Sequence, residues 1–164
     1  MSETKILSVK NREELALLRK KTPVFYFAKI DKKEIAEIIK KMRQAMTEHN
    51  GVGLAANQLG LPWRMFIARD ENKFYVIFNP KIIKKSREVT KLEEGCLSVP
   101  GEERLVPRPE KIILVGMDRG GKKIKISAWG LLGRIFQHEI DHLNGLLIID
   151  RGKPVISHNS GNAL

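Results

Sequence analysis

Two histidines and a glutamate near the C-terminus have the spacing of a hydrolytic metal site. His138 and His142 stand four residues apart, and Glu139 directly follows the first histidine. On an α-helix a four-residue step is a rotation of about 400°, so both imidazoles would project from one face. Glu139 would lie about 100° further round, near a shared ion without ligating it. Two neutral imidazoles and an adjacent carboxylate can hold a divalent cation and move protons beside it.

The residues around this pair predict the helix that the motif requires. Apolar and imidazole side chains recur at steps of 4, 3 and 4, the spacing of one buried helical stripe: Leu131, Ile135, His138 and His142. Asn144 and Gly145 then provide a C-terminal stop. Short motifs also occur by chance, so a helix that carries two incidental histidines is the alternative.

The third ligand of such a site must come from elsewhere in the chain, because a catalytic site has three protein ligands and one open position. Cys96 is the only cysteine, so no internal disulfide can form. It is the best candidate, since a divalent cation stabilises a thiolate, and Gly95 lets the backbone approach closely. A buried, inert thiol is nevertheless the commoner fate of a single cysteine.

A stretch with little side-chain bulk occupies residues 51–60, which read Gly-Val-Gly-Leu-Ala-Ala-Asn-Gln-Leu-Gly. Another chain could lie against such a backbone, and Gln58 places an amide donor near its end. It is not a phosphate loop, because it lacks the Gly-Lys-Ser/Thr ending and follows a predicted helix. Taken alone, the stretch favours a glycine-rich connector.

Hydrophobic periodicity predicts an α+β fold. A capping box at Asn11 begins a short helix, and Asp31 begins an amphipathic helix over residues 32–49. After Gly60, short segments rich in Val and Ile predict strands at residues 63–68, 74–78, 81–91, 104–118 and 122–127. This order lacks βαβ alternation. We therefore predict antiparallel β-sheets packed around a central metal-binding α-helix.

Length and composition favour one globular domain. The 164 residues, 42% hydrophobic and 30% charged, are typical of a soluble protein. Residues 1–164 are predicted to form a single domain whose polar tail, residues 151–164, is disordered. No apolar run approaches the roughly 20 residues that span a bilayer, and no segment of signal-peptide type follows Met1. The predicted location is cytoplasmic.

The formal charge of +11 favours weak association with polyanions. The basic residues are scattered, and no nucleic-acid motif with interleaved aromatic residues accompanies them. We therefore predict a non-specific attraction at most, with no specific nucleic-acid partner.

Together the three stretches resemble the peptide deformylase family, in its bacterial and organellar form. The family blocks occur in family order at residues 51–58, at residues 94–98 (Glu-Gly-Cys-Leu-Ser) and at residues 137–142 (Gln-His-Glu-Ile-Asp-His). The resemblance covers about residues 24–150. It implies a metal-dependent hydrolase that removes the N-formyl group from N-formylmethionine of nascent polypeptides and releases formate.

The resemblance also implies a role for each matching position. Cys96, His138 and His142 would hold one divalent ion, Fe²⁺ natively, with Zn²⁺, Ni²⁺ or Co²⁺ able to substitute. Ligand softness alone would favour zinc. Glu139 would be the general acid/base. The oxyanion hole would consist of the Gln58 side-chain amide and the Leu97 backbone N–H. The methionine pocket would be lined by Val52, Gly53, Leu131 and Ile135.

Two other functions remain open: another metallopeptidase or amidohydrolase, and a non-catalytic ribosome-associated protein that binds a metal. Intact Glu139 and Gln58 argue against the second, because neither is needed merely to hold an ion. Asp141 is predicted to orient its surroundings through a basic partner such as Arg108.

The chain departs from the family at its C-terminus. Many members continue into a helix that is implicated in ribosome docking, whereas the dozen or so polar residues after Asp150 are too few for an isolated helix. Docking by that route is therefore in doubt, and the net charge could supply the attraction. The predicted partners are the nascent formyl-Met polypeptide and, transiently, the ribosome; we predict no membrane partner and a monomer.

Overall fold

The computed structural model describes residues 4–71 and 73–155 of the chain. Its α-helices are α1 (Arg12–Leu18), α2 (Lys32–Glu48) and α3 (Gly130–Leu143), and short 3₁₀ turns lie at Phe27–Lys29, Ala56–Leu59 and Ile148–Asp150. The strands are β1 (Gly53–Ala55), β2 (Met65–Arg69), β3 (Phe74–Lys85), β4 (Val89–Gly95), β5 (Glu103–Pro109), β6 (Lys111–Met117), β7 (Lys123–Trp129) and β8 (Lys153–Pro154).

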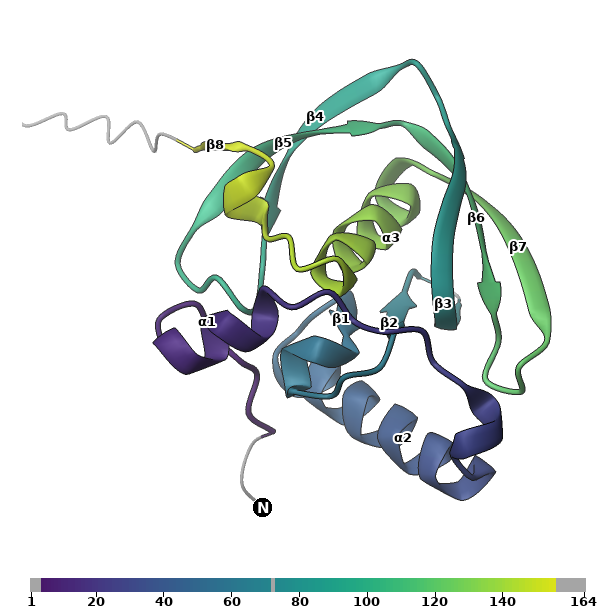
Figure 1. Ribbon diagram of the computed structural model, residues 1–164. Helices are drawn as coiled ribbons and strands as arrows, with labels where there is room; N and C mark the ends of the chain where they lie inside the picture. The colour runs from purple at the N-terminus through teal and green to yellow at the C-terminus, as the bar shows by residue number, and fades with distance from the viewer. Residues whose placement is uncertain (1–3, 72, 156–164) are drawn as a thin grey trace, which may run out of the picture.

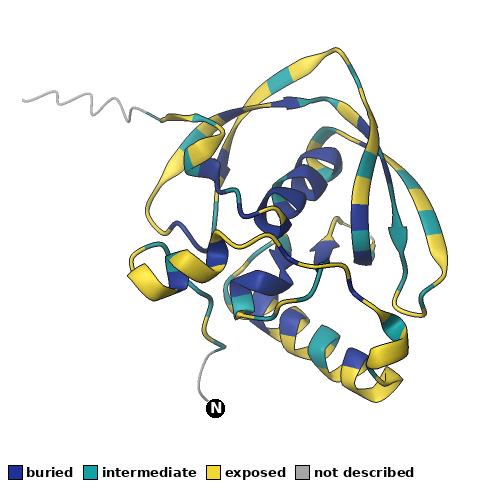
Figure 2. Cartoon of the chain, viewed as in Figure 1, coloured by how far each residue is buried: buried dark blue, intermediate teal, exposed yellow. Residues whose placement is uncertain are grey.

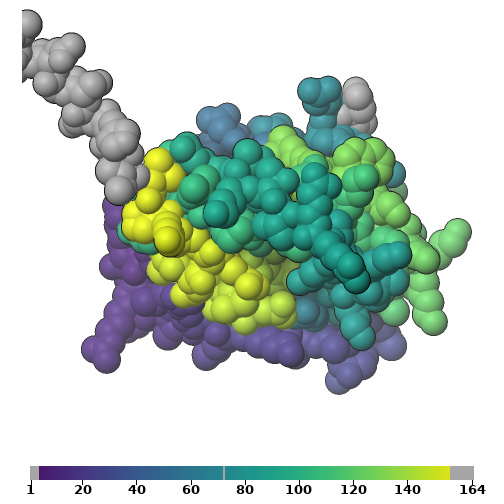
Figure 3. All heavy atoms as spheres, turned by 90° about the horizontal axis from the view of Figure 1, so that it is seen from above, coloured from purple at the N-terminus to yellow at the C-terminus, as the bar shows by residue number. Residues whose placement is uncertain are grey.

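Two antiparallel sheets enclose α3 (Figure 1). The larger sheet has the strand order β1-β2-β3-β6-β7, and the smaller has the order β4-β5-β8. Seen from above, the teal β3–β5 region and the yellow C-terminal segment lie beside each other over the molecule (Figure 3). The predicted α+β class, with antiparallel sheets around a central helix, is confirmed.

The chain passes from the larger sheet to the smaller one between β3 and β4, and it returns between β5 and β6. β3 pairs with β6 in the larger sheet, while β4 pairs with β5 in the smaller one. The predicted strands at residues 81–91 and 104–118 therefore had wrong bounds. The first spans the break between β3 and β4, and the second runs through Glu110, where the chain changes sheets. Pro109 directly precedes Glu110, and this proline was the signal that could have indicated the break.

A bulge explains a third difference. The strand predicted to end at Phe78 continues to Lys85, because the pairing of β3 with β6 shifts register between Phe78 and Lys81. Asn79 adopts a positive φ of 49° there, a conformation that asparagine tolerates better than most residues. Its side chain accepts a hydrogen bond from the Phe25 backbone N–H and donates one to the Phe25 carbonyl. The bulge lets Pro80 lie within a strand.

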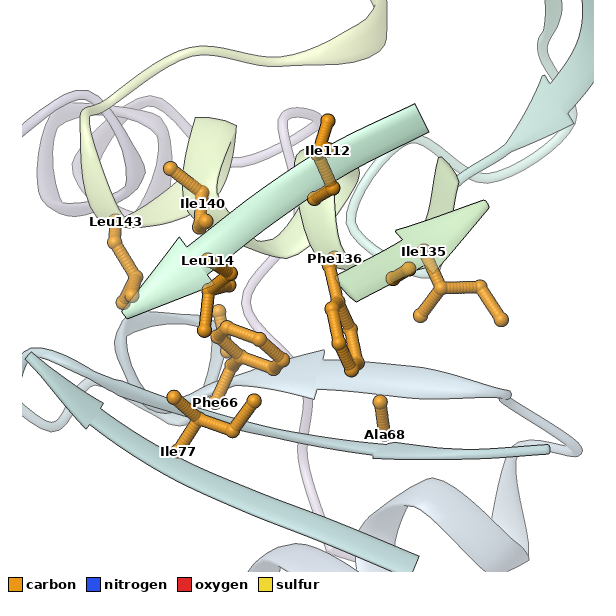
Figure 4. Packing of buried hydrophobic residues seen from close by; sticks show 11 residues of the cluster. Phe66, Ala68, Ile77, Ile112, Leu114, Ile135, Phe136, Ile140 and Leu143 are labelled. Carbon is orange, nitrogen blue, oxygen red and sulfur yellow. The ribbon is translucent and has the colours of Figure 1, made fainter. Parts of the chain in front are cut away.

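Both faces of the larger sheet are buried. Along β2, Phe66 and Ala68 pack toward α3, whereas Met65 and Ile67 pack toward α2, as the two-residue period of a strand requires. Figure 4 shows Phe66 beside Phe136 of α3, with ring centroids 5.4 Å apart. Figure 2 shows α3 buried along nearly its whole length, while one side of α2 faces solvent. The sheet thus anchors α3 at the centre of the protein.

The predicted helices on either side of this sheet are confirmed. In α2, Asp31 caps the N-terminus by accepting a hydrogen bond from the Glu34 N–H at 2.8 Å. In α3, Asn144 is the C-cap, and Gly145 follows with a positive φ of 75°. A Cβ at Gly145 would lie 2.2 Å from the Arg19 carbonyl oxygen, so both the backbone angle and the contact favour glycine.

The C-terminal segment is ordered further than the sequence predicts. β8 pairs with β5 through Lys153 and Pro154, and Arg151 forms an ion pair with Asp141 at 2.6 Å. The predicted disordered tail therefore cannot begin at residue 151; its residues 156–164 lie outside the described part of the chain. Within that part, no helix has the length and apolar character needed to cross a membrane.

Candidate metal centre

Three side chains from two distant elements meet at the centre of the fold. His138 and His142 project from α3, and Cys96 follows the last residue of β4. The Cys96 Sγ lies 3.2 Å from His142 Nε2, which lies 3.2 Å from His138 Nε2. All three ligand atoms lie within 4.8 Å of one another. The structure thus brings together the three residues that the sequence singles out as ligands.

The arrangement of these donors fits a divalent ion. Two imidazole nitrogens and one sulfur converge on a single point, a donor set found in catalytic zinc-type sites. The other ring nitrogen of His138, Nδ1, lies 3.1 Å from the Glu94 carboxylate, which holds the imidazole with Nε2 toward the shared point. His142 is almost fully buried, at 1% exposure, so its orientation is restricted by packing.

The electrostatics of the cluster favour a thiolate. Burial alone would raise the pKa of the Cys96 thiol, but the adjacent His142 and His138 bring it well below its usual value. Burial would likewise lower the pKa of His138, whereas Cys96 and Glu94 bring it well above its usual value. The site therefore stabilises an anionic sulfur, the form that ligates metals.

Glu94 supports His138 from behind, and the sequence analysis gave it no role. It is buried, and although burial raises the pKa of a carboxyl group, hydrogen bonds from Arg108 and His138 bring the pKa of Glu94 well below its usual range. Arg108 donates to both oxygens of Glu94, at 2.6 and 2.9 Å. A carboxylate two residues before the candidate ligand Cys96, at the end of β4, was a signal that could have revealed it.

Arg134 was also missed. Its guanidinium donates to Glu94 at 2.7 Å, to the Val106 carbonyl at 2.9 Å and to the Thr90 carbonyl at 2.7 Å. It therefore ties α3 to both β4 and β5. Its place four residues before His138 puts it on the same helix face, which is the pattern that could have indicated it.

Asp141 lies where the sequence predicts it, beside Arg108. The Arg108 Nη1 lies 2.8 Å from Asp141 Oδ2, and Arg151 donates to both carboxylate oxygens, at 3.1 and 2.6 Å. Asp141 does not join the three candidate ligands. A chain of contacts thus runs from Asp141 through Arg108 and Glu94 to His138.

Glu139 lies beside the ligands with an unusual environment. It is 3% exposed, and this burial raises the pKa of Glu139 to about 7. Its Oε2 has no hydrogen-bond partner among the described residues. A Cβ at Gly53 would lie 2.3 Å from the other oxygen, Oε1, so the absence of a side chain at Gly53 makes room for this carboxylate.

The remaining predicted site residues line one cleft. It has a volume of about 740 Å³ and opens onto Cys96, His138 and Glu139. Its wall also includes the residues predicted for the methionine pocket and the oxyanion hole: Val52, Gly53, Leu131, Ile135, Gln58 and Leu97. Ile135 is buried, whereas Val52 and Leu131 are exposed at the rim.

Gln58 is held rigidly in the wall of this cleft. It is 2% exposed. Its Oε1 accepts a hydrogen bond from the Ala55 N–H at 2.9 Å, and its Nε2 donates to Ser98 Oγ at 3.1 Å. The amide group carries two N–H donors, so one of them is left for a ligand. Neighbouring Asn57 donates to the His142 carbonyl at 2.7 Å, which joins this stretch to α3.

Comparisons with known proteins agree over most of the chain. The family described as "Polypeptide deformylase" matches residues 4–157. A peptide deformylase of Thermodesulfovibrio yellowstonii is 42% identical over 127 residues, 74% of this chain and 76% of the relative. One of Dictyoglomus thermophilum is 45% identical over 131 residues, 80% of this chain and 84% of the relative. A crystal structure of peptide deformylase from Thermotoga maritima has a TM-score of 0.83 at 34% identity and covers 94% of this chain and 100% of its own.

Proposed function

The chain belongs to the polypeptide deformylase family, and on that premise we propose that Cys96, His138 and His142 hold its catalytic ion beside Glu139. The enzyme is a metal-dependent hydrolase that removes the N-formyl group from N-formylmethionine at the start of nascent polypeptides. The observation that carries the proposal is the convergence of one sulfur and two ring nitrogens within 4.8 Å in the cleft that contains Glu139.

A divalent ion at this position supplies Lewis acidity and makes hydroxide available near neutral pH. The native ion that we propose is Fe²⁺, on the ground of family resemblance. The donor set alone would suit zinc equally well, and Zn²⁺, Ni²⁺ or Co²⁺ would be accepted by the same three side chains.

Glu139 is the proton carrier in this proposal. Hydrolysis of the formamide adds water to the formyl carbon and breaks its bond to the methionine nitrogen, so one proton must pass from water to the departing amine. A buried carboxylate with a pKa of about 7 is suited to both accepting and releasing a proton near neutral pH. Its unpaired Oε2 leaves a lone pair for the attacking water.

Gln58 and Leu97 stabilise the charge that develops on the formyl oxygen. The free N–H of the Gln58 amide and the Leu97 backbone N–H are the two donors that we assign to this oxyanion hole. Donors fixed before the reaction need no reorganisation when the charge forms, and losing one lowers the rate by about 10²- to 10³-fold.

The cleft wall accounts for the preference for formyl-methionine. Val52, Leu131 and Ile135 offer apolar contact to a flexible thioether side chain, and Gly53 adds no side chain between them and Glu139. Because a formyl carbon carries only hydrogen, the narrow space beside Gly53 would admit it and exclude bulkier acyl groups.

The decisive experiment is to measure formate release from a formyl-Met peptide by anaerobically purified protein, with metal analysis of the same sample. We expect stoichiometric iron and formate release, and no cleavage of the unformylated peptide. Cleavage of an internal peptide bond would instead assign the site to a peptidase. A metal-loaded protein that releases no formate would leave only a structural role for the ion.

The setting in which the enzyme works follows from its substrate. Formylated chains emerge from the ribosome, so we infer a cytoplasmic enzyme that contacts ribosomes transiently through its net charge of +11. We propose a monomer, because one chain supplies every residue of the cleft. Ribosome binding that does not weaken with salt would contradict the charge-driven contact, and sedimentation would test the monomer.

A further inference from the structure

A second cavity lies behind the metal centre, on the other side of α3. It has a volume of about 560 Å³, and its wall is formed by parts of β3, β5, the end of α3 and the flanking residues Arg64 and Arg151. The α3 residues that line it include Gln137 and Ile140, whereas those that line the catalytic cleft include Ile135 and Glu139. At 100° per residue the mean directions of these two pairs differ by about 150°, so the two cavities lie against largely opposite faces of α3. We call this cavity the back pocket.

The charges of the back pocket are strongly unequal. Its wall contains one carboxylate, Asp141, and five cationic side chains: Arg64, Lys81, Lys85, Arg108 and Arg151. A cavity lined by one sign of charge focuses the field and concentrates counter-ions. The catalytic cleft does the opposite, since its exposed charged residues are glutamates.

Two of these cationic side chains form ion pairs with carboxylates of the protein, whereas, among the described residues, the other three do not. Arg108 and Arg151 share Asp141, and Arg108 also binds Glu94. Arg64 caps α3 by donating to the Leu143 carbonyl at 3.2 Å and to Asn144 Oδ1 at 3.0 Å. Within residues 4–71 and 73–155, no carboxylate forms an ion pair with Arg64, Lys81 or Lys85.

Buried polar groups make the back pocket more than a patch of surface lysines. Arg108, Gln137 and Asp141 line it although each is less than 10% exposed. Gln137 is fixed by two hydrogen bonds from its Nε2, to the carbonyls of Pro109 and Gly133, both at 3.0 Å. The wall is therefore rigid, and unpaired ammonium groups lie over it.

We propose that the back pocket binds a phosphate group. Three cations without acidic partners suit a ligand that carries more than one negative charge, and both arginine and lysine are common ligands of phosphate. The phosphate could be free or part of an RNA backbone, since either offers the same oxygens. The site takes no part in the deformylation chemistry.

The test is calorimetric titration of inorganic phosphate into the metal-loaded enzyme at constant ionic strength. We expect one saturable site, weakened about tenfold or more by the double change Lys81→Gln and Lys85→Gln. Lys122→Gln with Lys123→Gln is the matched control, because it removes the same charge from an exposed turn outside the pocket. Absence of saturable binding, or an equal loss in both variants, would overturn the proposal.

Two further measurements distinguish the two sources of phosphate and test whether the variants keep their catalytic activity. Displacement of phosphate from the unaltered protein by a short RNA duplex, together with weaker direct binding of that duplex to the Lys81/Lys85 variant, would identify an RNA backbone. Binding of phosphate without such displacement would identify a free ligand. Formate release should be unchanged in both variants, because neither pair lines the catalytic cleft. Unchanged release beside weakened phosphate binding separates this site from the catalytic one.

Discussion

The two sides of α3 both carry buried polar groups, but they differ in how completely those groups are paired. On the cleft side, Glu139 Oε2 has no hydrogen-bond partner within the described residues. On the opposite side, both oxygens of Asp141 accept hydrogen bonds from arginines. Glu94 of β4, which orients His138, is paired on both oxygens as well. The unpaired carboxylate that can take part in the reaction thus lies on one side of α3. The paired groups that fix the positions of neighbouring side chains lie elsewhere around the helix.

The difference has a physical reason. An unpaired buried polar atom destabilises a protein by about 1–3 kcal/mol, so it persists where a ligand or substrate completes it. A buried ion pair that is fully hydrogen-bonded adds little net stability but restricts the orientation of its members. The unpaired side is therefore where the reaction is expected, and the paired side is where the ligand geometry is maintained.

The largest expected effect comes from the unpaired side, with Glu139→Gln. The amide keeps the shape of the side chain but cannot accept and release the proton, so kcat should fall by about 10²- to 10⁴-fold while metal content is unchanged. Steady-state formate release with metal analysis checks this. Glu93→Gln, at an exposed position on the same cleft, is the control; full activity in the Glu139 variant would remove that carboxylate from the mechanism.

A smaller loss is expected from Gly53→Ala, which crowds the same carboxylate without changing it. The added Cβ would lie 2.3 Å from Glu139 Oε1, so the carboxylate must move, and a displacement of about 1 Å can lower activity about 10²-fold. Gly95→Ala is a matched control next to Cys96, since a Cβ there meets nothing within 4 Å. Equal kcat/KM values for the two variants would show that the fit between Gly53 and Glu139 is unimportant.

The smallest effect is expected from the paired side, with Asp141→Ala. Loss of this carboxylate should loosen Arg108 and, through Glu94, the orientation of His138, so metal affinity should fall by about 10- to 100-fold. Competition with a chelator measures it directly. Asp150→Ala removes an acid that pairs with Arg19 instead of with this network. Unchanged metal affinity in the Asp141→Ala variant would show that this chain of contacts does not affect metal binding.

Local patterns in the sequence were sufficient for the helices and for the shared face of His138 and His142. The apolar spacing along residues 32–49 and 131–142 predicted α2 and α3, because a helix repeats within a few residues of chain. The four-residue step from His138 to His142 likewise predicted their shared face. Cys96 was named only as the best candidate from the residues, and the resemblance of three blocks to one family made it specific.

Long-range pairing could not be predicted in the same way. Residues 104–118 were predicted as one strand, although Glu110 divides them between two sheets. An apolar alternation does not indicate which strand lies beside it. β1 was not predicted either. Its glycine-containing sequence looks like a connector, and it becomes a strand only through its pairing with β2.

The sequence by itself determined the donor types, their order along the chain and the helix that carries two of them, since these depend on neighbours a few residues apart. Only the tertiary structure decided that Cys96 meets those histidines, that Glu94 holds His138 while Arg134 holds Glu94, and that unpaired cations gather behind α3. Cys96 and His142 are 46 residues apart in the chain, and Glu94 and Arg134 are 40 apart. Their contacts arise from sheet pairing and core packing, which local periodicity does not encode.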